Sequence, residues 1–460
     1  MTTDNMVTPE LKCVYFLGIG GIGMSAIARC FNARGVSVSG YDKTPTPLTD
    51  ELIAEGIPVH FEERIDLIPA HAELVVYTPA VPVGNTELIY IKEHGYTLRK
   101  RSEVLAMLVD DMKTLAIAGT HGKTSITSVV SHILKKGGFP VTAFIGGICK
   151  NYNSNFISSE NSTIAVVEAD EYDRSFLKLH PDIAVISAMD ADHLDIYGTK
   201  ETVEESYALF AANIRKGGFL IHKSGLRLPE QKDATVLTYA ASGTADFHAE
   251  NIRIEHANFI FDLRHPNGII QNIVAGVPGR HNIENAIAAA AACFCCGLDE
   301  ERIKTGIESY TGVKRRFDYH INTPKMVYID DYGHHPEELR TFINSVRELY
   351  PEQKITGIFQ PHLYSRTRDF ADEFAKSLKL LDRVYLMDIY PARELPIEGV
   401  TSKMLLDKIE LPDKKLLRRE AVIDELLNDL PEVLLTLGAG DIDQLVEPIE
   451  HALKQKIHGK

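Results

Sequence analysis

The chain has 460 residues, too many for a single hydrophobic core, and its composition is that of an ordinary globular protein of about three domains. Its net charge of −15 argues against binding to nucleic acid or to an anionic membrane surface. There is no apolar run of the roughly 20 residues that cross a bilayer, and the polar segment 1–12 does not have the pattern of a signal peptide. Six scattered cysteines are expected to be free thiols, which predicts a cytoplasmic location without membrane insertion.

The first 110 residues alternate between strand and helix patterns. An apolar run at 12–17 leads into the sequence GIGGIGMS, and a second predicted strand at 36–41 ends before Asp42. The glycines have the G-x-G-x-x-G spacing. Dinucleotide-binding folds carry a ribose-binding carboxylate about 20 residues after these glycines, and Asp42 stands near that position. This pattern predicts a Rossmann-like unit and leaves a nicotinamide-dependent dehydrogenase open as one function. The three glycines are Gly18, Gly20 and Gly23.

A second α/β unit begins near residue 112 with the sequence AIAGTHGKTS at 116–125. A buried strand is predicted at 114–118 and an amphipathic helix at 123–136. A glycine turn between a strand and a helix presents backbone N–H groups to phosphate oxygens. In such a loop Lys123 reaches the β- and γ-phosphates and Thr124 ligates Mg²⁺. The turn is shorter than the usual loop, so a turn that contains Gly-Lys-Thr by coincidence is the alternative.

Acidic residues follow the next two predicted strands. The strand at 163–167 ends in EADE, so Glu168 could supply an oxygen ligand for Mg²⁺, with Asp170 and Glu171 as competing choices. The strand at 182–187 is followed by MDADHLD, which contains His193. Because open parallel sheets gather ligands at the carboxyl ends of their strands, both segments are expected beside the phosphate loop.

The third unit starts near residue 325 and again alternates strands with helices. The sequence DDYGHHP at 330–336 ends one strand, and two histidines there could bind substrate or move a proton. The alternative is a polar turn that caps a helix beginning at Pro336. The next strand end carries Arg366, which could bind a carboxylate in bidentate fashion. Arg316, in a basic cluster between the second and third units, could offset phosphate charge or belong to a solvated face.

Taken together, these motifs resemble the Mur ligase family, and they occur in the same order over nearly the whole chain. The segments that carry the resemblance are GIGGIGMS at 18–25, GTHGKTS at 119–125, EADE at 168–171, DHLD at 192–195, GRHNIENA at 279–286, DDYGHHP at 330–336, QPHLYSRTR at 360–368 and GAGDI at 438–442.

The resemblance implies an α/β fold of three domains. Residues 1–111 would form a Rossmann-like domain for a UDP-sugar, 112–322 a central P-loop ATPase, and 323–460 a Rossmann-like domain for an amino acid. The first glycine loop would then bind a UDP diphosphate and not NAD.

The resemblance also implies a set of site residues. The catalytic residues would be Lys123, His193, His335 and Arg316. ATP would be bound by Gly119, Thr120, His121, Gly122, Lys123, Thr124, Ser125, His281, Asn285 and Arg316. The UDP-sugar would be bound by Gly18, Gly20, Gly21, Ile22, Gly23, Asp42 and Arg101. His335 and Arg366 would bind the amino acid, and Thr124, Glu168 and His193 would bind Mg²⁺.

Within the family, the GIGGIGMS opening favours the member that joins L-alanine to the lactyl carboxylate of UDP-N-acetylmuramate through an acyl phosphate, in peptidoglycan precursor synthesis. The member that attaches a recycled tripeptide to the same sugar is the alternative. Later enzymes of the pathway carry a carbamylated lysine where this chain has Tyr207, which is consistent with the L-alanine branch. We expect ATP and Mg²⁺ as cofactors, domain closure on binding, and a monomer or homodimer.

Overall fold

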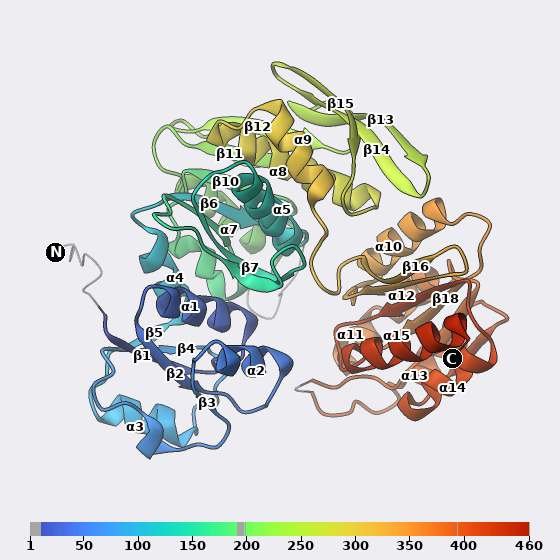
Figure 1. Ribbon diagram of the computed structural model, residues 1–460, viewed down its shortest axis with the longest axis horizontal. Coiled ribbons are helices and arrows are strands. Elements are labelled where there is room, and N and C mark those ends of the chain that lie inside the picture. Colours follow the sequence, from blue (N-terminus) through green and yellow to red (C-terminus); the bar gives the residue numbers. More distant parts are fainter. Residues whose placement is uncertain (1–10, 191–196, 198, 393, 460) are drawn as a thin grey trace. The chain divides into compact units, whose positions relative to one another are not determined.

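The computed structural model describes residues 11–190, 197, 199–392 and 394–459 (Figure 1). The chain forms two compact units. The first contains the residues up to 250 together with 262–273 and 284–311, and the second contains 251–261, 274–283 and 312–460. None of the helices in the described residues combines the length and the apolar character that crossing a bilayer requires.

The first sheet is fully parallel, with strand order β3-β2-β1-β4-β5. Alternate residues of β1 are buried on opposite faces: Val14 and Phe16 belong to one apolar cluster, whereas Tyr15 and Leu17 belong to another. Burial on both faces is typical of a parallel strand covered by helices. The elements are β1 (Cys13–Leu17), α1 (Ile22–Ala33), β2 (Ser37–Tyr41), α2 (Pro47–Ala54), β3 (Val59–His60), a 3₁₀ turn η1 (Ile65–Leu67), β4 (Leu74–Tyr77), α3 (Thr86–Glu93), β5 (Leu98–Lys100) and α4 (Arg101–Val109).

The second sheet has strand order β15-β14-β13-β12-β11-β10-β6-β9-β7-β8. Its elements are β6 (Lys113–Ala118), α5 (Lys123–Lys136), β7 (Val141–Cys149), β8 (Ser154–Ile157), β9 (Ile164–Glu168), η2 (Tyr172–Lys178), β10 (Ile183–Ile186), α7 (Lys200–Ala212), β11 (Phe219–Lys223), β12 (Thr235–Ala240), β13 (Phe247–Glu255), β14 (Asn258–His265), β15 (Gly268–Val274), α8 (Arg280–Cys296) and α9 (Glu300–Ser309).

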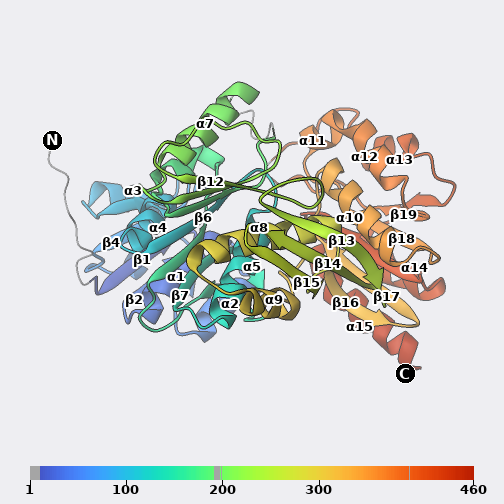
Figure 2. The same ribbon diagram turned by 90° about the horizontal axis from the view of Figure 1, so that it is seen from above.

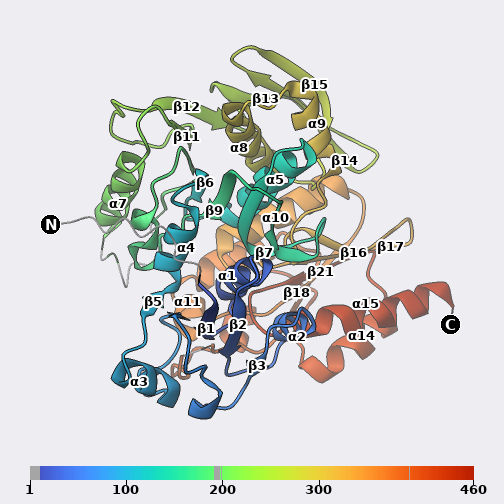
Figure 3. The ribbon, with the colours of Figure 1, turned by 60° about the vertical axis from the view of Figure 1, so that its left-hand side comes forward.

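The central strand β6 lies between β9 and β10 and is parallel to both. The segments that follow these three strands therefore emerge at the same edge of the sheet. Helix α5 packs against β7, β9 and α9 (Figure 2). Helix α1 of the preceding domain packs against β7 and β8, within the same compact unit (Figure 3).

The third sheet has strand order β16-β17-β21-β18-β19-β20, and its elements are β16 (Asp318–Thr323), β17 (Met326–Asp331), α10 (Pro336–Leu349), β18 (Ile355–Phe359), α11 (Tyr364–Asp369), α12 (Ala371–Leu378), β19 (Arg383–Leu386), α13 (Ser402–Lys408), β20 (Lys414–Leu416), η3 (Arg419–Ala421), α14 (Val422–Asn428), β21 (Val433–Leu437) and α15 (Asp443–His458). The sequence at 365–379 predicts a single helix after β18, but in the structure it is divided at Phe370, whose backbone leaves the helical conformation.

The predicted α/β class is confirmed by the three sheets. The alternation of strands and helices in all three units also predicts parallel pairing throughout, and this prediction is wrong for two pairs of strands. Strand β8 pairs antiparallel with β7, and β16 pairs antiparallel with β17. Both pairs are joined by short connections, which allow antiparallel but not parallel pairing. The domain boundary proposed at residue 322 falls inside β16, and the exact domain limits stay a proposal.

Candidate active site

The loop between β6 and α5 is built around two glycines in the left-handed region of backbone conformation. Gly119 has φ of +135° and Gly122 has φ of +83°. A Cβ on Gly119 would lie 2.1 Å from Oγ of Ser187, and one on Gly122 would lie 2.9 Å from Oδ1 of Asn285. Only glycine fits such positions. The loop thus packs closely against the end of β10 and against helix α8. Its last residues lead directly into the first backbone N–H groups of α5.

Lys123, the first residue of α5, points back over this loop. Its Nζ donates to the carbonyl of Gly119 at 2.7 Å and lies 2.8 Å from both carboxylate oxygens of Glu171. The predicted proximity of the phosphate loop and the EADE segment is therefore real. The sequence predicts Glu171 as one possible metal ligand, whereas in the structure it is the partner of the loop lysine.

Thr124 and Glu168 lie together, as predicted for two ligands of one metal ion. Oγ1 of Thr124 donates to Oε2 of Glu168 at 3.2 Å, and Oε1 of Glu168 accepts from the backbone N of Gly146 at 2.5 Å. A hydroxyl and a carboxylate are hard oxygen donors, which suit Mg²⁺ when phosphates and water complete its coordination. Within the described residues no group of three or more His, Cys, Asp or Glu could hold a metal ion by itself. His193 lies outside the described residues.

The segment after β10 supplies two residues, Ser187 and Asp190, whose contacts with the loop were not predicted from the sequence. Ser187 donates to the carbonyls of Ala118 and His121, and the backbone N of Asp190 donates to Oγ1 of Thr120 at 3.2 Å. Nε2 of His121 lies 3.6 Å from Oδ2 of Asp190. The alternation of strands predicted that this edge would be polar, but nothing in the local sequence of Asp190 indicated which residue it would contact.

Asn285 and His281 occupy different surroundings although both belong to α8. Asn285 lies beside Gly122, consistent with its predicted place at the ATP site. His281 is in the second compact unit, where its ring centroid is 6.5 Å from that of Phe317. Burial, followed by the charge of Arg316, lowers the pKa of His281 to about 4, so this imidazole is neutral at pH 7.

The N-terminal glycine loop is held by the end of β2. The backbone N groups of Gly18 and Ile19 donate to the carbonyl of Tyr41, and Gly20 N donates to Oδ2 of Asp42 at 2.8 Å. Asp42 therefore shapes the loop itself, in addition to the contact with the UDP-sugar that is predicted for it. Gly21 is the N-cap of α1 and has no side-chain cap, which leaves the first N–H groups of the helix for an anion. Ile22 is the first residue of that helix.

Arg101 lies between this loop and the acidic segment of the central sheet. A Cβ on Gly23 would be 2.9 Å from Nη1 of Arg101, and Nη2 of the same side chain is 3.3 Å from Oδ2 of Asp170. The predicted sugar-site arginine is thus beside the glycine loop.

Arg315 and Arg316, in the basic cluster between the second and third sheets, have different surroundings. Arg315 has φ of +64° and is fixed by Asp330 at 3.1 Å and by the carbonyl of Gly438 at 2.6 Å. Arg316 has no ion pair among the described residues, and its guanidinium lies 5.9 Å from the ring centroid of Tyr332. Arg315 therefore supports the fold, whereas the phosphate contact of Arg316 stays a prediction.

Aromatic and basic side chains gather after β17 and β18. The rings of His334 and His362 are 6.0 Å apart, and His362 stacks on Tyr390 at 5.6 Å. Burial, followed by the charges of His334 and Arg366, lowers the pKa of His362 to about 4. Arg366 forms no ion pair with any described residue, and its charge helps to lower the pKa of Glu394, so its contact with an amino-acid carboxylate stays a prediction. His362 is a member of this group that the sequence analysis did not select.

His335 is the N-cap of α10, as the alternative reading of this turn required. Its Nδ1 accepts from the backbone N of Glu337 at 3.4 Å, and its ring meets Phe370 edge-on at 5.0 Å. Nearby, burial raises the pKa of Asp331 to about 7, although the backbone N–H groups of Phe317 and Gly333 donate to its carboxylate. The capping contact does not exclude the predicted role of His335 toward an amino acid.

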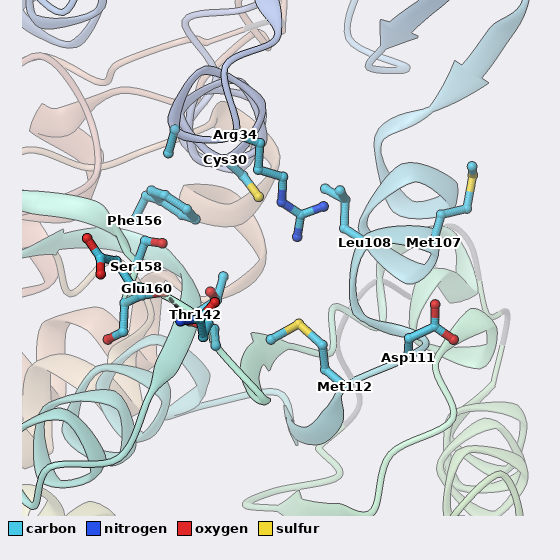
Figure 4. A pocket seen from close by; sticks show the side chains of 14 residues that line it. Cys30, Arg34, Met107, Leu108, Asp111, Met112, Thr142, Phe156, Ser158 and Glu160 are labelled. Carbon is cyan, nitrogen blue, oxygen red and sulfur yellow. Dashed lines mark hydrogen bonds between the residues drawn. The ribbon is translucent and has the colours of Figure 1, made fainter. Parts of the chain in front are cut away.

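Tyr207 packs in the core, 5.3 Å from the ring of Phe176 and edge-on to it. A separate cavity of about 520 Å³ lies in the same compact unit (Figure 4). Its wall combines apolar side chains of α1 and α4 with Arg34 and with the polar segment after β8. No residue predicted for the active site is among the described residues that line it. The lining residues that are drawn and labelled include Cys30, Arg34, Met107, Leu108, Met112 and Phe156.

Comparison with known proteins agrees with this geometry. Residues 13–113 match the Mur ligase family, catalytic domain; residues 117–293 match the Mur ligase middle domain; and residues 315–441 match the Mur ligase, glutamate ligase domain. The UDP-N-acetylmuramate–L-alanine ligase of Flavobacterium johnsoniae is 48% identical over 452 residues, which cover 97% of this chain and 99% of that protein.

Two solved structures are similar over almost the whole chain. The UDP-N-acetylmuramate–alanine ligase of Thermotoga maritima has a TM-score of 0.82 at 26% identity and covers 97% of this chain and 99% of its own. A murein peptide ligase of Psychrobacter arcticus, at 20% identity, shares the fold with a TM-score of 0.70 over 96% of this chain and 98% of its own. The chain, with all three domain types in order and close relatives along its full length, belongs to the Mur ligase family.

Proposed function

We propose that this protein joins L-alanine to the lactyl carboxylate of UDP-N-acetylmuramate, with hydrolysis of ATP to ADP and phosphate. The observation that carries the proposal is the loop at 119–124, where Thr124 meets the carboxylate of Glu168 at the end of β9 and Lys123 meets that of Glu171 just after it. That arrangement suits phosphoryl transfer. The choice of L-alanine is supported by the F. johnsoniae relative, which is similar along its full length.

Amide formation from a carboxylate needs an activated acyl group. The lactyl carboxylate oxygen attacks the γ-phosphorus, the bond to the β-phosphate oxygen breaks, and ADP leaves. The amine of L-alanine then attacks the acyl phosphate, and inorganic phosphate is expelled with loss of one amine proton. Both steps develop negative charge on phosphoryl oxygens, so nearby cations lower the barrier.

The described residues have distinct parts in this scheme. We propose that the loop N–H groups and Lys123 hold the phosphates of ATP, and that Arg316 offsets charge on the transferred group. Thr124 and Glu168 would hold Mg²⁺, which neutralises phosphate charge when bound. His193 stays a proposed ligand of a second ion.

The remaining substrates are assigned by charge and position. The start of α1 and Arg101 are proposed to hold the diphosphate of the sugar nucleotide, because a helix N-terminus and a guanidinium both favour an anion. Arg366 would bind the carboxylate of L-alanine, and His335 would position its amine. The described cysteines are free, consistent with a reducing compartment, and a cytoplasmic location is part of the proposal.

The test is phosphate release from Mg·ATP with UDP-N-acetylmuramate, in the presence of L-alanine, of a tripeptide that begins with L-alanine, or of no acceptor. Release that requires both the sugar nucleotide and L-alanine is expected. Release with the tripeptide alone would assign the chain to the other branch of the family. Lys123→Ala is the matched control: it should lose turnover and still bind the sugar nucleotide.

A further inference from the structure

The ammonium group of Lys123 has three protein acceptors, as many as it has donors. Nζ contacts the Gly119 carbonyl at 2.7 Å and each carboxylate oxygen of Glu171 at 2.8 Å. A phosphate oxygen can therefore bind to Nζ only if it shares or replaces one of these acceptors. The three acceptor atoms belong to two different groups: a neutral carbonyl within the loop and a charged carboxylate from the segment after β9.

Glu171 is held in place by contacts that do not involve Lys123. Its backbone carbonyl accepts from the hydroxyl of Tyr197 at 2.5 Å and from the backbone N of Arg174 at 2.9 Å. The Glu171 side chain is only 3% exposed, whereas that of Lys123 is 17% exposed. A buried carboxylate without a cation is strongly destabilised, so the pair is held together. Glu171 is consequently the fixed partner, and the flexible lysine side chain is directed by it.

The three acidic side chains of the EADE segment each contact a different group. Glu168 accepts from Thr124, Asp170 pairs with Arg101, and Glu171 pairs with Lys123. Glu171 is the member whose carboxylate meets the group proposed to bind the transferred phosphate.

We propose that Glu171 is a positioning residue for the phosphoryl-transfer step, which holds Nζ of Lys123 at the mouth of the loop beside the Gly119 carbonyl. This inference rests on the proposed function of Lys123 as a ligand of ATP phosphates. The lysine then meets the phosphate from one direction and with most of its rotamer freedom already removed, which favours the transition state over looser bound arrangements.

The charge of Glu171 makes the expected effect specific. A carboxylate beside the phosphate site weakens attraction for the anionic ground state, so its loss does not weaken ATP binding through charge. Its loss does release the ammonium from a fixed position. Glu171→Gln, which keeps the shape and removes the charge, is expected to lower kcat about 10- to 100-fold. The KM for Mg·ATP should change less than about threefold or fall.

The experiment measures kcat and KM for Mg·ATP with saturating UDP-N-acetylmuramate and L-alanine. Because the chain contains no tryptophan, nucleotide affinity is measured separately with a fluorescent N-methylanthraniloyl ATP analogue. The matched control is Glu425→Gln. Glu425 lies in α14, far along the chain from the loop, and its carboxylate is 2.5 Å from Nζ of Lys415. The control variant should retain the kcat of the unmodified protein.

Glu171→Asp is the second variant, needed if the glutamine variant does not fold. It keeps the charge on a shorter side chain, so it is expected to recover part of the lost kcat. A variant that melts at a lower temperature but has an unchanged kcat per folded molecule would show that Glu171 only supports the structure, and the proposal would be wrong.

A double variant separates this proposal from the proposed function. If Glu171 acts through Lys123, Glu171→Gln should reduce the residual single-turnover rate of Lys123→Ala less than about twofold. Equal losses in both backgrounds would overturn the positioning role. Full turnover by Lys123→Ala would instead overturn the assignment of the loop, whatever Glu171 does.

Discussion

Nη2 of Arg101 lies 3.3 Å from Oδ2 of Asp170, so the arginine beside the N-terminal glycine loop is paired with the acidic segment after β9. The two residues belong to α4 and to the segment after β9, and they are separated by 69 positions in the sequence. Both carboxylate and guanidinium are partly exposed, so the pair is weak by itself. An incoming diphosphate can therefore compete for the guanidinium at small cost.

Arg101→Ala should raise the KM for UDP-N-acetylmuramate about tenfold and change the KM for Mg·ATP less than twofold, because a guanidinium–phosphate contact is lost at the sugar site alone. This expectation follows from the proposed place of Arg101 at the sugar site, and steady-state phosphate release measures both constants. Asp170→Asn is the matched control, since it breaks the same ion pair and leaves the cation. If both variants change the KM for ATP equally, Arg101 serves the ATP site.

Gly119→Ala should abolish tight binding of Mg·ATP, because the new Cβ would meet Ser187 Oγ at 2.1 Å in a backbone conformation that disfavours side chains. The crowding should also cost about 1–3 kcal/mol of stability. Gly138→Ala is the control: Gly138 also has a positive φ, of +83°, but no atom lies within 4 Å of the added Cβ. It should cost about 1 kcal/mol and leave nucleotide affinity intact. Equal affinities in the two variants would contradict the crowded loop.

His335→Asn tests whether the imidazole does more than cap α10. Asparagine is as good an N-cap as any residue, so stability should change by less than about 0.5 kcal/mol. If the imidazole positions the amine, kcat/KM for L-alanine should fall about tenfold while the KM for ATP is unchanged. Arg366→Ala provides the comparison and should mainly raise the KM for L-alanine. Unchanged kinetics in His335→Asn would leave the capping contact as the only role of this side chain.

The buried histidine His132 is expected to make the protein less stable in mild acid. Its ring lies between the Tyr152 hydroxyl, at 2.9 Å, and the Ser309 hydroxyl, at 3.0 Å. Burial, followed by the charge of Lys136, lowers its pKa to about 4. Between the unfolded pKa near 6.5 and the folded value, only the unfolded chain gains the proton, so stability falls as the pH is lowered.

Because of His132, the free energy of unfolding is expected to be about 2 kcal/mol lower at pH 5 than at pH 8. Thermal unfolding of the intact chain at both pH values measures it. In His132→Gln, which retains polar atoms without a titrating group, the drop in unfolding temperature between the two pH values should be smaller. An identical drop in both proteins would contradict the assignment of this pH dependence to His132.

Much of the nucleotide site could be predicted because its signals are local. A buried strand, two glycines with positive φ and a Lys-Thr helix start all lie within about 15 consecutive residues, and each has a direct physical reason. The same is true of Pro336, which indicated a helix start and hence the capping position of His335. The resemblance to the family was recognised because the motifs occur in the same order along the chain.

The sequence by itself determined the α/β class, the glycine loop, and the acidic and basic segments that follow the strands. Only the tertiary structure decided which members of those segments meet. Lys123 contacts Glu171 and not Asp170, and Asn285 is brought beside Gly122, because strand order and helix packing join residues far apart in the chain. Such pairings depend on where each strand ends and on the direction of each side chain, which local patterns of hydrophobicity do not contain.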